Sequence, residues 1–351
     1  MELADLKHMV PTDLFDLGRT SLEEMSSLPR PYIGVTEWSD DIGDNLKIRL
    51  GNYEAPLIRL CAAEHSVPVV GIDTTNIELG QTARGVLCAF RGTIVKAEDG
   101  RYEYMRHGPF IFHITNGNRQ VLYQNLTESF LNMRKSGPAP PLEKMTDKIR
   151  SILERWLQRQ VSFNYNGSII LWDGSLAAPR VSRSLPIMSK MLKEARDNEN
   201  TVLAFSKKTT LNLWNRNLDL IDSRLAPSLL DIDEEARLGF VGQLCFLGHV
   251  YAAKLMPGSY TFRLDIDRSI PAPKAIEATK KLLASDGLRE NYPETLRLAH
   301  VLSKFSPAET IGMHRFIGKT YGFQTQQSPN IRSAIFGPLE GNVPPEGVFA
   351  H

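Results

Sequence analysis

The sequence predicts an α/β protein in which a mixed sheet is flanked by helices. Three observations favour this fold class. Short runs rich in β-branched apolar residues indicate buried strands, and longer segments with apolar residues three and four positions apart indicate helices. Three of the strand-like runs follow one another before the first strong helical pattern, and two of the runs end in an aspartate.

Composition narrows the class of protein. The 351 residues are 42% hydrophobic and 23% charged, which is typical of a soluble globular chain with a substantial core. The formal net charge of +1 shows no global basic excess for nucleic acid, although a local patch at a cleft could still attract it. The three cysteines lack metal-binding spacing, and no signal-like or membrane-spanning stretch occurs. We therefore expect a cytoplasmic protein without membrane contact.

The predicted elements begin with strands and then alternate. Residues 1–65 are polar and carry helix-capping signals, which predict an N-terminal helical extension. Three successive strands are predicted at 67–73, 85–95 and 102–114. After a proline-rich break, the expected elements are helix 142–160, strand 168–173, helix 185–198 and strand 201–206.

The carboxyl-terminal part predicts a hairpin and a further helix. The hairpin is expected within 239–267, and the helix from about Pro293 to Phe305. Residues 338–351 carry Pro and Gly without periodicity and predict a flexible tail. The chain is accordingly divided into the extension, one domain at 66–337, and the tail.

This order of elements is the layout of a ribonuclease-H-like core. In such a core, the first and fourth strands of the sheet carry metal-binding carboxylates. Periodicity alone does not separate it from other α/β folds. The positions of Asp73 and Asp173, on the first and fourth predicted strands, favour it.

Each of these two aspartates closes a short apolar run. Asp73 follows Val67–Ile72, and Asp173 follows Ser168–Trp172. A carboxylate at the carboxyl end of a buried strand lies at the rim of the sheet, where ligands of α/β folds bind. Either aspartate alone is compatible with turn chemistry, because Asp-Thr-Thr-Asn and Asp-Gly are common in turns. Together they indicate a metal or phosphate site.

A third acid is expected on the helix before the Asp173 strand. The core-facing stripe of this helix consists of Ile149, Ile152, Leu153, Trp156 and Leu157. Glu154 falls beside that stripe and is therefore the acid expected to reach the edge of the sheet. Glu143 and Asp147 share its side of the helix and stay as alternatives. A solvated surface acid is the ordinary role for any of the three.

Four short motifs carry a resemblance to a known family: Gly71–Asp73, Leu171–Leu176, Phe205–Lys207 and Tyr292–His300. In these motifs and their order, the chain resembles the NurA family of nucleases from about residue 66 to 305. The resemblance implies that Asp73 and Asp173 bind the metal, that His300 is the late histidine of the site, and that Glu154 is the helix glutamate. One departure is that the family often has Asp-Gly-Ser after the first aspartate, where this chain has Asp-Thr-Thr.

The resemblance also implies an activity and partners. It implies a DNA nuclease, a 5′-to-3′ exonuclease with single-stranded endonuclease activity, that acts in DNA end resection and double-strand-break repair. It further implies a homodimer and a hexameric HerA-type ATPase that translocates DNA. Carboxylate oxygens suit Mg²⁺ or Mn²⁺, and an imidazole shifts the preference toward Mn²⁺. No GxxxxGK[ST] loop occurs in the sequence, so energy for translocation is expected from that partner.

Two further residues are candidates for substrate contact. Lys207 follows the 201–206 strand and is placed to pair with a phosphate, although a solvated lysine is about as good an interpretation. Tyr292 could stack on a base or orient His300, and its alternative role is to anchor the following helix. Arginines on the Glu154 helix could contact DNA phosphates: Arg150, Arg155 and Arg159.

Two other functions compete with the nuclease. A phosphotransferase of the actin and sugar-kinase type has the same strand order, but the glycine-rich phosphate loop of that class does not follow Asp73. An inactive docking subunit of a translocase is the non-enzymatic alternative. Retention of all four candidate ligands argues against it.

Overall fold

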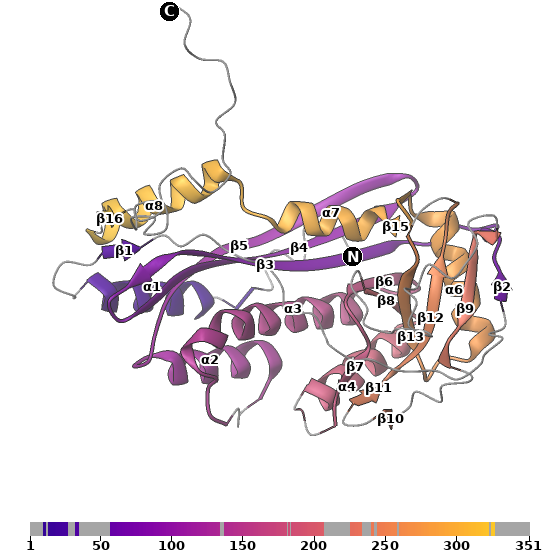
Figure 1. The fold of residues 1–351 in the computed structure, drawn as a ribbon, viewed down its shortest axis with the longest axis horizontal. Helices are drawn as coiled ribbons and strands as arrows, with labels where there is room; N and C mark the ends of the chain where they lie inside the picture. The colour runs from indigo at the N-terminus through magenta and orange to yellow at the C-terminus, as the bar shows by residue number, and fades with distance from the viewer. Residues whose placement is uncertain are drawn as a thin grey trace, which may run out of the picture.

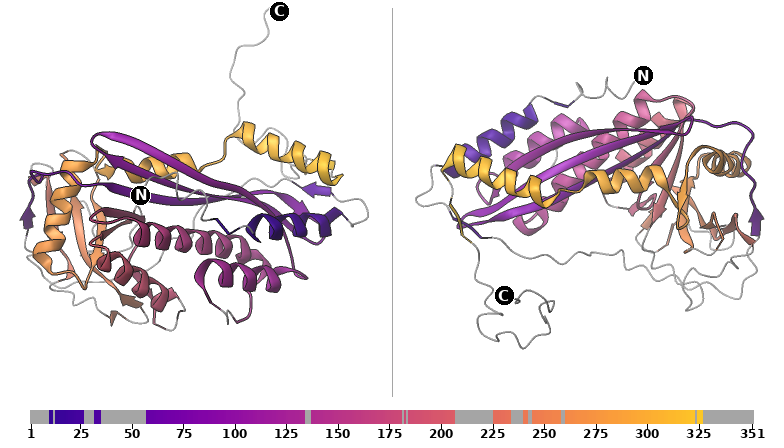
Figure 2. Two further views of the ribbon diagram at one scale, coloured as in Figure 1. Left: turned by 180° about the vertical axis from the view of Figure 1, so that it is seen from behind. Right: turned by 90° about the horizontal axis from the view of Figure 1, so that it is seen from above.

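A long mixed sheet with helices on both faces forms the body of the molecule (Figures 1 and 2). The computed structural model describes residues 10–11, 13–26, 32–34, 57–133, 137–180, 182, 184–206, 225–233, 240–241, 244–257, 260–322 and 324–326. The helices are α1 Asp13–Ser26, α2 Arg119–Leu131, α3 Met145–Asn164, α4 Ser184–Asp197, α6 Ala272–Ser285, α7 Glu294–Ser303 and α8 Pro307–Tyr321. A 3₁₀ turn, Leu142–Lys144, leads into α3.

The strands fall into one large sheet and two small ones. The large sheet contains β1 Tyr32–Gly34, β2 Leu57–Arg59, β3 Val69–Thr82, β4 Gly85–Glu98, β5 Arg101–Thr115, β6 Ile169–Asp173, β8 Thr201–Ser206, β9 Ser228–Asp231, β12 Gly248–Lys254, β13 Phe262–Asp267 and β16 Gln324–Gln326. The small sheets contain β7 Ala177–Pro179, β10 Phe240–Val241 and β11 Leu244–Phe246, and separately β14 Leu288–Arg289 and β15 Tyr292–Pro293.

The centre of the large sheet has the predicted strand order. β5, β4 and β3 form an antiparallel meander, β6 lies parallel to β3 on its other side, and β8 lies parallel to β6. The order β5-β4-β3-β6-β8 confirms the predicted α/β fold class with a ribonuclease-H-like arrangement. β13, β12, β9 and β2 continue the sheet beyond β8, all antiparallel to their neighbours.

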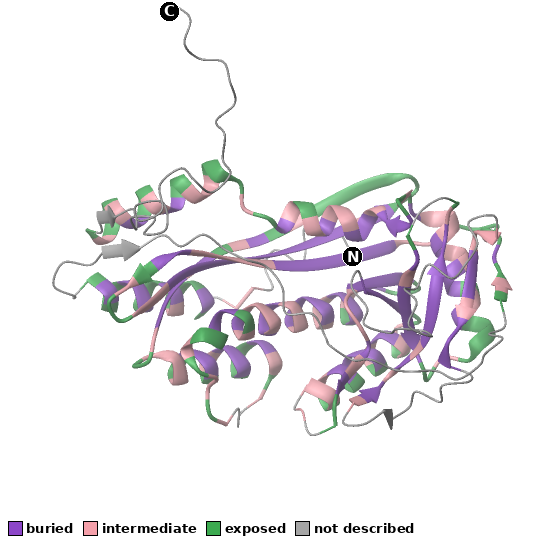
Figure 3. Cartoon of the chain, viewed as in Figure 1, coloured by how far each residue is buried: buried purple, intermediate pink, exposed green. Residues whose placement is uncertain are grey.

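The two faces of the sheet bury different apolar clusters. Val70 and Ile72 of β3 pack with α2, α3 and α4 on one face, whereas Val69 packs with α6 and α7 on the other. Side chains of a strand alternate between faces, so Asp73 belongs to the α7 face. Gly71 allows α7 to approach, because a Cβ there would lie only 3.1 Å from atoms of Thr295. Figure 3 shows the central strands almost entirely buried between these helices.

One strand prediction is wrong in its length. β3 was expected to end at Asp73, but it continues to Thr82 and pairs with β4 throughout, with one bulge near Gly80. The β-branched residues Thr74, Thr75 and Ile77 favour this extension. The chain turns only where Thr82 Oγ1 accepts hydrogen bonds from the backbone N–H groups of residues 84 and 85. Asp73 therefore lies within a strand, and Asp173 alone ends one.

Residues before 66 contribute to the same sheet and core. In α1, Leu14 joins the cluster under α3, and Leu22 and Met25 pack with β3, β4 and α8. β2 pairs with β9 at the far edge of the sheet.

The predicted tail at 338–351 lies outside the described residues. Among the helices that the structure describes, none is long and apolar enough to cross a bilayer.

Candidate metal centre

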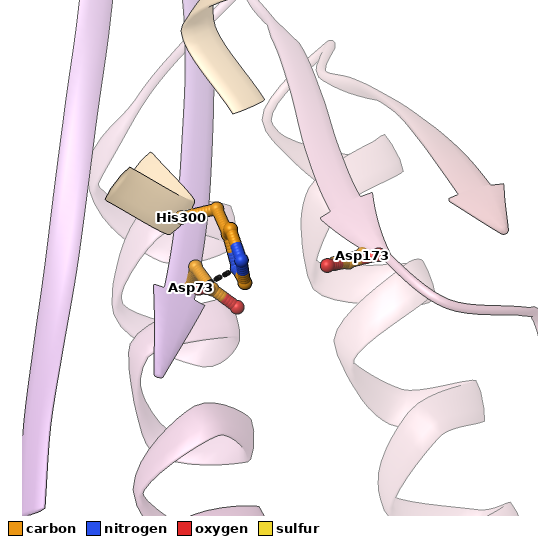
Figure 4. Close-up of side chains that lie close together, drawn as sticks. All are labelled: Asp73, Asp173 and His300. Carbon is orange, nitrogen blue, oxygen red and sulfur yellow. Dashed lines mark hydrogen bonds and ion pairs between the residues drawn. The ribbon is translucent and has the colours of Figure 1, made fainter. Parts of the chain in front are cut away.

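Three predicted residues from three distant segments converge at one point of the sheet. Asp73 comes from β3, Asp173 from the end of β6 and His300 from α7 (Figure 4). One potential ligand atom from each lies within 4.8 Å of the other two. Two carboxylate oxygens and an imidazole nitrogen at this separation can coordinate one divalent cation.

Strand register brings the two aspartates together. β3 and β6 are parallel, and Ile72 pairs with Trp172, so Asp73 and Asp173 stand at neighbouring positions on the same face. β6 ends there because Gly174 adopts a φ of +113°, a conformation that favours glycine. The turn is held by the Gly174 N–H, which donates to the Phe205 carbonyl at 2.8 Å. β3 continues beyond Asp73, so the candidate centre lies beside the middle of β3 and at the carboxyl end of β6.

α7 supplies two donors to one oxygen of Asp73. His300 Nδ1 lies 2.9 Å from Asp73 Oδ2, and the Ser303 hydroxyl donates to the same oxygen at 2.9 Å. The Asp73 side chain is 11% exposed and the His300 side chain 40% exposed. The centre is therefore accessible to solvent beside the His300 ring. The Asp73 carboxylate is nearly buried and is held by the two hydrogen bonds from α7.

Glu154 approaches the aspartates from α3, on the opposite face of the sheet. Its side chain is 22% exposed; Arg150 Nη1 lies 3.8 Å from its carboxylate, and the Gln158 amide donates to it at 3.3 Å. Burial raises the pKa of Glu154, the charges of Asp73 and Asp173 raise it further, and Arg155 and Arg150 oppose the rise. Glu154 is not one of the three residues whose ligand atoms gather within 4.8 Å, so its role as a fourth ligand stays a prediction.

The two alternative acids lie further away. Glu143 is exposed in the 3₁₀ turn before α3, and Asp147 is exposed in the first turn of α3. Asp147 precedes Glu154 by roughly 10 Å along the helix, at about 1.5 Å per residue. Geometry therefore favours Glu154 over both.

The structure gives Tyr292 a buried position behind Asp173. Its ring packs against Phe205 and Phe262, with centroid distances of 6.0 and 5.3 Å, and is 6% exposed. The predicted stacking on a base is not available to a ring enclosed in this way. Burial raises the pKa of Tyr292 well above its usual range, as do the charges of Asp173 and Asp73. A neutral hydroxyl beside Asp173 can orient that carboxylate.

The basic residues predicted to contact DNA differ in whether they are already engaged within the protein. Lys207 lies outside the described residues. Arg155 donates to Gln158 at 2.7 Å, and Arg159 lies 3.5 Å from Glu194, so both are engaged within the protein. Arg150, 37% exposed and beside Glu154, is the arginine of this helix that is best placed to meet a phosphate.

Sequence reasoning missed Ser303 and Gln158, which contact the predicted acids. Ser303 follows His300 by three residues, and Gln158 follows Glu154 by four. Residues at these spacings lie on the same side of a helix. Helical periodicity applied outward from His300 and Glu154 would have found both.

Comparison with known proteins gives structural neighbours only. No protein-family model matches the chain, and no curated protein matches it. Among solved structures, a NurA nuclease from Sulfolobus solfataricus aligns with 14% identity and a TM-score of 0.49, over 76% of this chain and 88% of that one. Endonuclease V from Bacillus subtilis aligns with 11% identity and a TM-score of 0.34, over 75% and 88% of the two chains.

A second NurA structure aligns with 10% identity and a TM-score of 0.34, over 74% of this chain and 90% of that one. An Argonaute from A. aeolicus also aligns, with 9% identity and a TM-score of 0.23, over 68% of this chain and 28% of that one. At such identities and scores the similarity assigns no function.

Proposed function

We propose that the chain is a divalent-metal-dependent deoxyribonuclease that hydrolyses phosphodiester bonds. The observation that supports this most strongly is the convergence of Asp73, Asp173 and His300 within 4.8 Å. Glu154 adds a third carboxylate from the other face of the sheet. Carboxylates gathered in this way repel one another, and a bound cation relieves that repulsion.

The donor set fits Mn²⁺ or Mg²⁺, with Mn²⁺ favoured by the imidazole. Asp73, Asp173 and His300 would hold the ion, with Glu154 as the additional carboxylate. When bound, such an ion lowers the pKa of a coordinated water and stabilises charge on phosphate oxygens. Within the chain, the Tyr292 hydroxyl orients Asp173, and Lys207 is proposed to pair with a phosphate.

The finer biological role is proposed from the sequence resemblance to the NurA family. On that basis the substrate is DNA, at single-stranded and duplex ends, and digestion runs 5′ to 3′ with single-stranded endonuclease activity. The same resemblance supports a role in end resection and double-strand-break repair, a homodimer, a hexameric HerA-type translocase as partner, and a cytoplasmic location.

The structure favours this proposal over the phosphotransferase alternative. After Asp73 the chain continues as strand to Thr82, so no phosphate-binding loop begins at that aspartate. Such a loop is what a kinase of the actin type needs at this place. The nuclease needs only the carboxylates.

The test is Mn²⁺-dependent degradation of 5′-labelled DNA by the parent protein and by Asp73→Asn. We expect at least a roughly 1000-fold loss of cleavage in the variant, because the carboxylate charge is removed while the side-chain volume is kept. Asp197→Asn, an exposed acid that pairs with Lys193, is the matched control and should cleave like the parent. Equal cleavage by the parent and Asp73→Asn would refute the proposed centre.

A further inference from the structure

Ser303 is a completely buried residue that ends α7 and touches the candidate centre. Its exposed fraction is 0%. The hydroxyl oxygen lies 2.9 Å from Asp73 Oδ2 and 2.9 Å from the carbonyl oxygen of His300. One hydroxyl thus has two acceptors within reach, one on the sheet and one in its own helix.

The hydroxyl carries a single proton, so it can donate fully to one of these acceptors at a time. A serine in a helix ordinarily donates to a carbonyl of the preceding turn. An ionised carboxylate is the stronger acceptor, and its hydrogen bonds are roughly twice as strong as those between neutral groups. The charged form of Asp73 therefore takes the proton of Ser303.

The same carboxylate oxygen also faces His300 Nδ1 at 2.9 Å. Both α7 donors therefore hold Oδ2, which leaves Oδ1 as the Asp73 oxygen for a ligand. The two donors differ in accessibility, because Ser303 is buried whereas the His300 side chain is 40% exposed and belongs to the proposed ligand set. If the imidazole turns toward a cation, Ser303 is the donor from α7 that stays on Asp73.

We propose that Ser303 is a positioning residue that fixes the orientation of the Asp73 carboxylate for divalent-cation binding. This role rests on the proposed metal centre, and it does not require that the centre cleave DNA. Groups that hydrogen-bond to metal ligands fix their orientation, and their loss typically lowers metal affinity or activity by about 10-fold to 100-fold.

The test compares Ser303→Ala with the parent by calorimetric titration of Mn²⁺ alone. We expect the apparent dissociation constant for Mn²⁺ to rise by about 10-fold in the variant. The Mn²⁺ concentration that gives half-maximal DNA cleavage should rise by a similar factor, while the maximal rate at saturating Mn²⁺ falls much less. A purely structural role would not separate these two quantities.

Two further variants make the comparison decisive. Ser162→Ala removes an equally buried serine hydroxyl from α3, away from the centre, and should bind Mn²⁺ like the parent. Ser303→Cys replaces the hydroxyl with a slightly larger thiol that is a poor donor, and it should weaken Mn²⁺ binding like Ser303→Ala. If Ser303→Ala does not fold, Ser303→Cys supplies the same measurement.

The outcomes separate this inference from the proposed function. Mn²⁺ affinity within twofold of the parent in the folded Ser303 variant would overturn the role of Ser303. A parent that binds Mn²⁺ and cleaves no DNA would overturn the nuclease, and the titration of Ser303→Ala would still decide the role of Ser303. A parent that binds no Mn²⁺ would overturn both.

Discussion

The molecule contains two groups of buried and partly buried carboxylates that differ in their hydrogen-bond and ion-pair partners. The first is the candidate centre around Asp73. The second, which we call the paired cluster, lies on β9, β12 and β13 and the residues next to them, with one arginine contributed by α4. Its members are the acids Asp231, Asp233, Asp265 and Asp267 and the bases Arg196, Arg263, Arg268 and His249.

Charge in the paired cluster is balanced by side chains of the chain itself. Arg263 holds Asp265 through two hydrogen bonds of 2.6 Å. Arg268 Nη2 lies 2.5 Å from Asp233, whose carboxylate is also 3.2 Å from His249 Nδ1. Buried carboxylates with such partners need no added cation.

The candidate centre is held together by different groups. The guanidinium nearest to its acids in the described ion pairs is that of Arg150, 3.8 Å from Glu154, and Asp73 is met by an imidazole and a hydroxyl. Two carboxylates that lie within 4.8 Å of each other and of an imidazole are suited to receive a cation from solution. Burial of acids alone therefore does not mark a metal centre, whereas the gathering of two carboxylates and an imidazole within 4.8 Å does.

The largest effect on stability is expected when the paired cluster loses an acid. Asp265→Ala leaves the Arg263 charge buried without its bidentate partner and removes the acceptor of the Leu176 N–H. We predict a loss of about 3–5 kcal/mol in the free energy of unfolding, measured in urea. The exposed Asp197→Asn serves as the control, and a change below roughly 1 kcal/mol in Asp265→Ala would show that the cluster is not balanced as described.

A smaller effect on stability, of opposite sign, is expected when Glu154 beside the candidate centre is replaced by Gln. The folded-state pKa of Glu154 is raised, chiefly by burial, so the folded protein binds this proton more tightly than the unfolded chain does. Its contribution to stability is therefore present at low pH and is lost as pH rises through the folded pKa. In EDTA, the melting temperature of the parent should fall relative to that of Glu154→Gln between about pH 4 and pH 8.

The measurement is a series of thermal melts of both proteins at stepped pH without metal. Asp147→Asn, which alters an exposed acid on the same helix, should track the parent. If the difference in melting temperature between the parent and Glu154→Gln stayed constant over this pH range, the pKa of Glu154 would not be raised by burial and by the two aspartates.

The smallest effect is expected from Tyr292→Phe. The substitution removes the hydroxyl beside Asp173 and keeps the ring between Phe205 and Phe262. We predict a loss of about 1 kcal/mol or less in unfolding free energy and a several-fold fall in Mn²⁺-dependent cleavage. Tyr165→Phe, at another buried tyrosine, should change stability similarly without changing cleavage, and equal cleavage by Tyr292→Phe and the parent would remove the orienting role.

Much of the central sheet could be predicted because its signals are local. The β-branched runs that form β3, β6 and β8 are bounded by turn residues, and the amphipathic α3 is readable from its apolar stripe. The extent of β3 beyond Asp73 was missed, because polar Thr and Asn residues resemble a turn until a partner strand covers them. Tertiary pairing overrode the local signal there.

The candidate site was predictable only in part, for a related reason. Asp73 and Asp173 stand at strand positions that the sequence marks, but the approach of α7 to β3 depends on packing across Gly71. That approach is what brings His300 and Ser303 to Asp73. The burial of Tyr292 likewise follows from its contact with Phe205 and Phe262, which no local pattern indicates.

Anomalous diffraction from a crystal of the protein soaked in Mn²⁺ tests the candidate centre directly. We expect one strong anomalous peak bounded by Asp73, Asp173 and His300, and no peak at Asp231, Asp233 and His249, whose charge Arg268 helps to balance. An empty candidate centre, or an ion bound in the paired cluster instead, would contradict it.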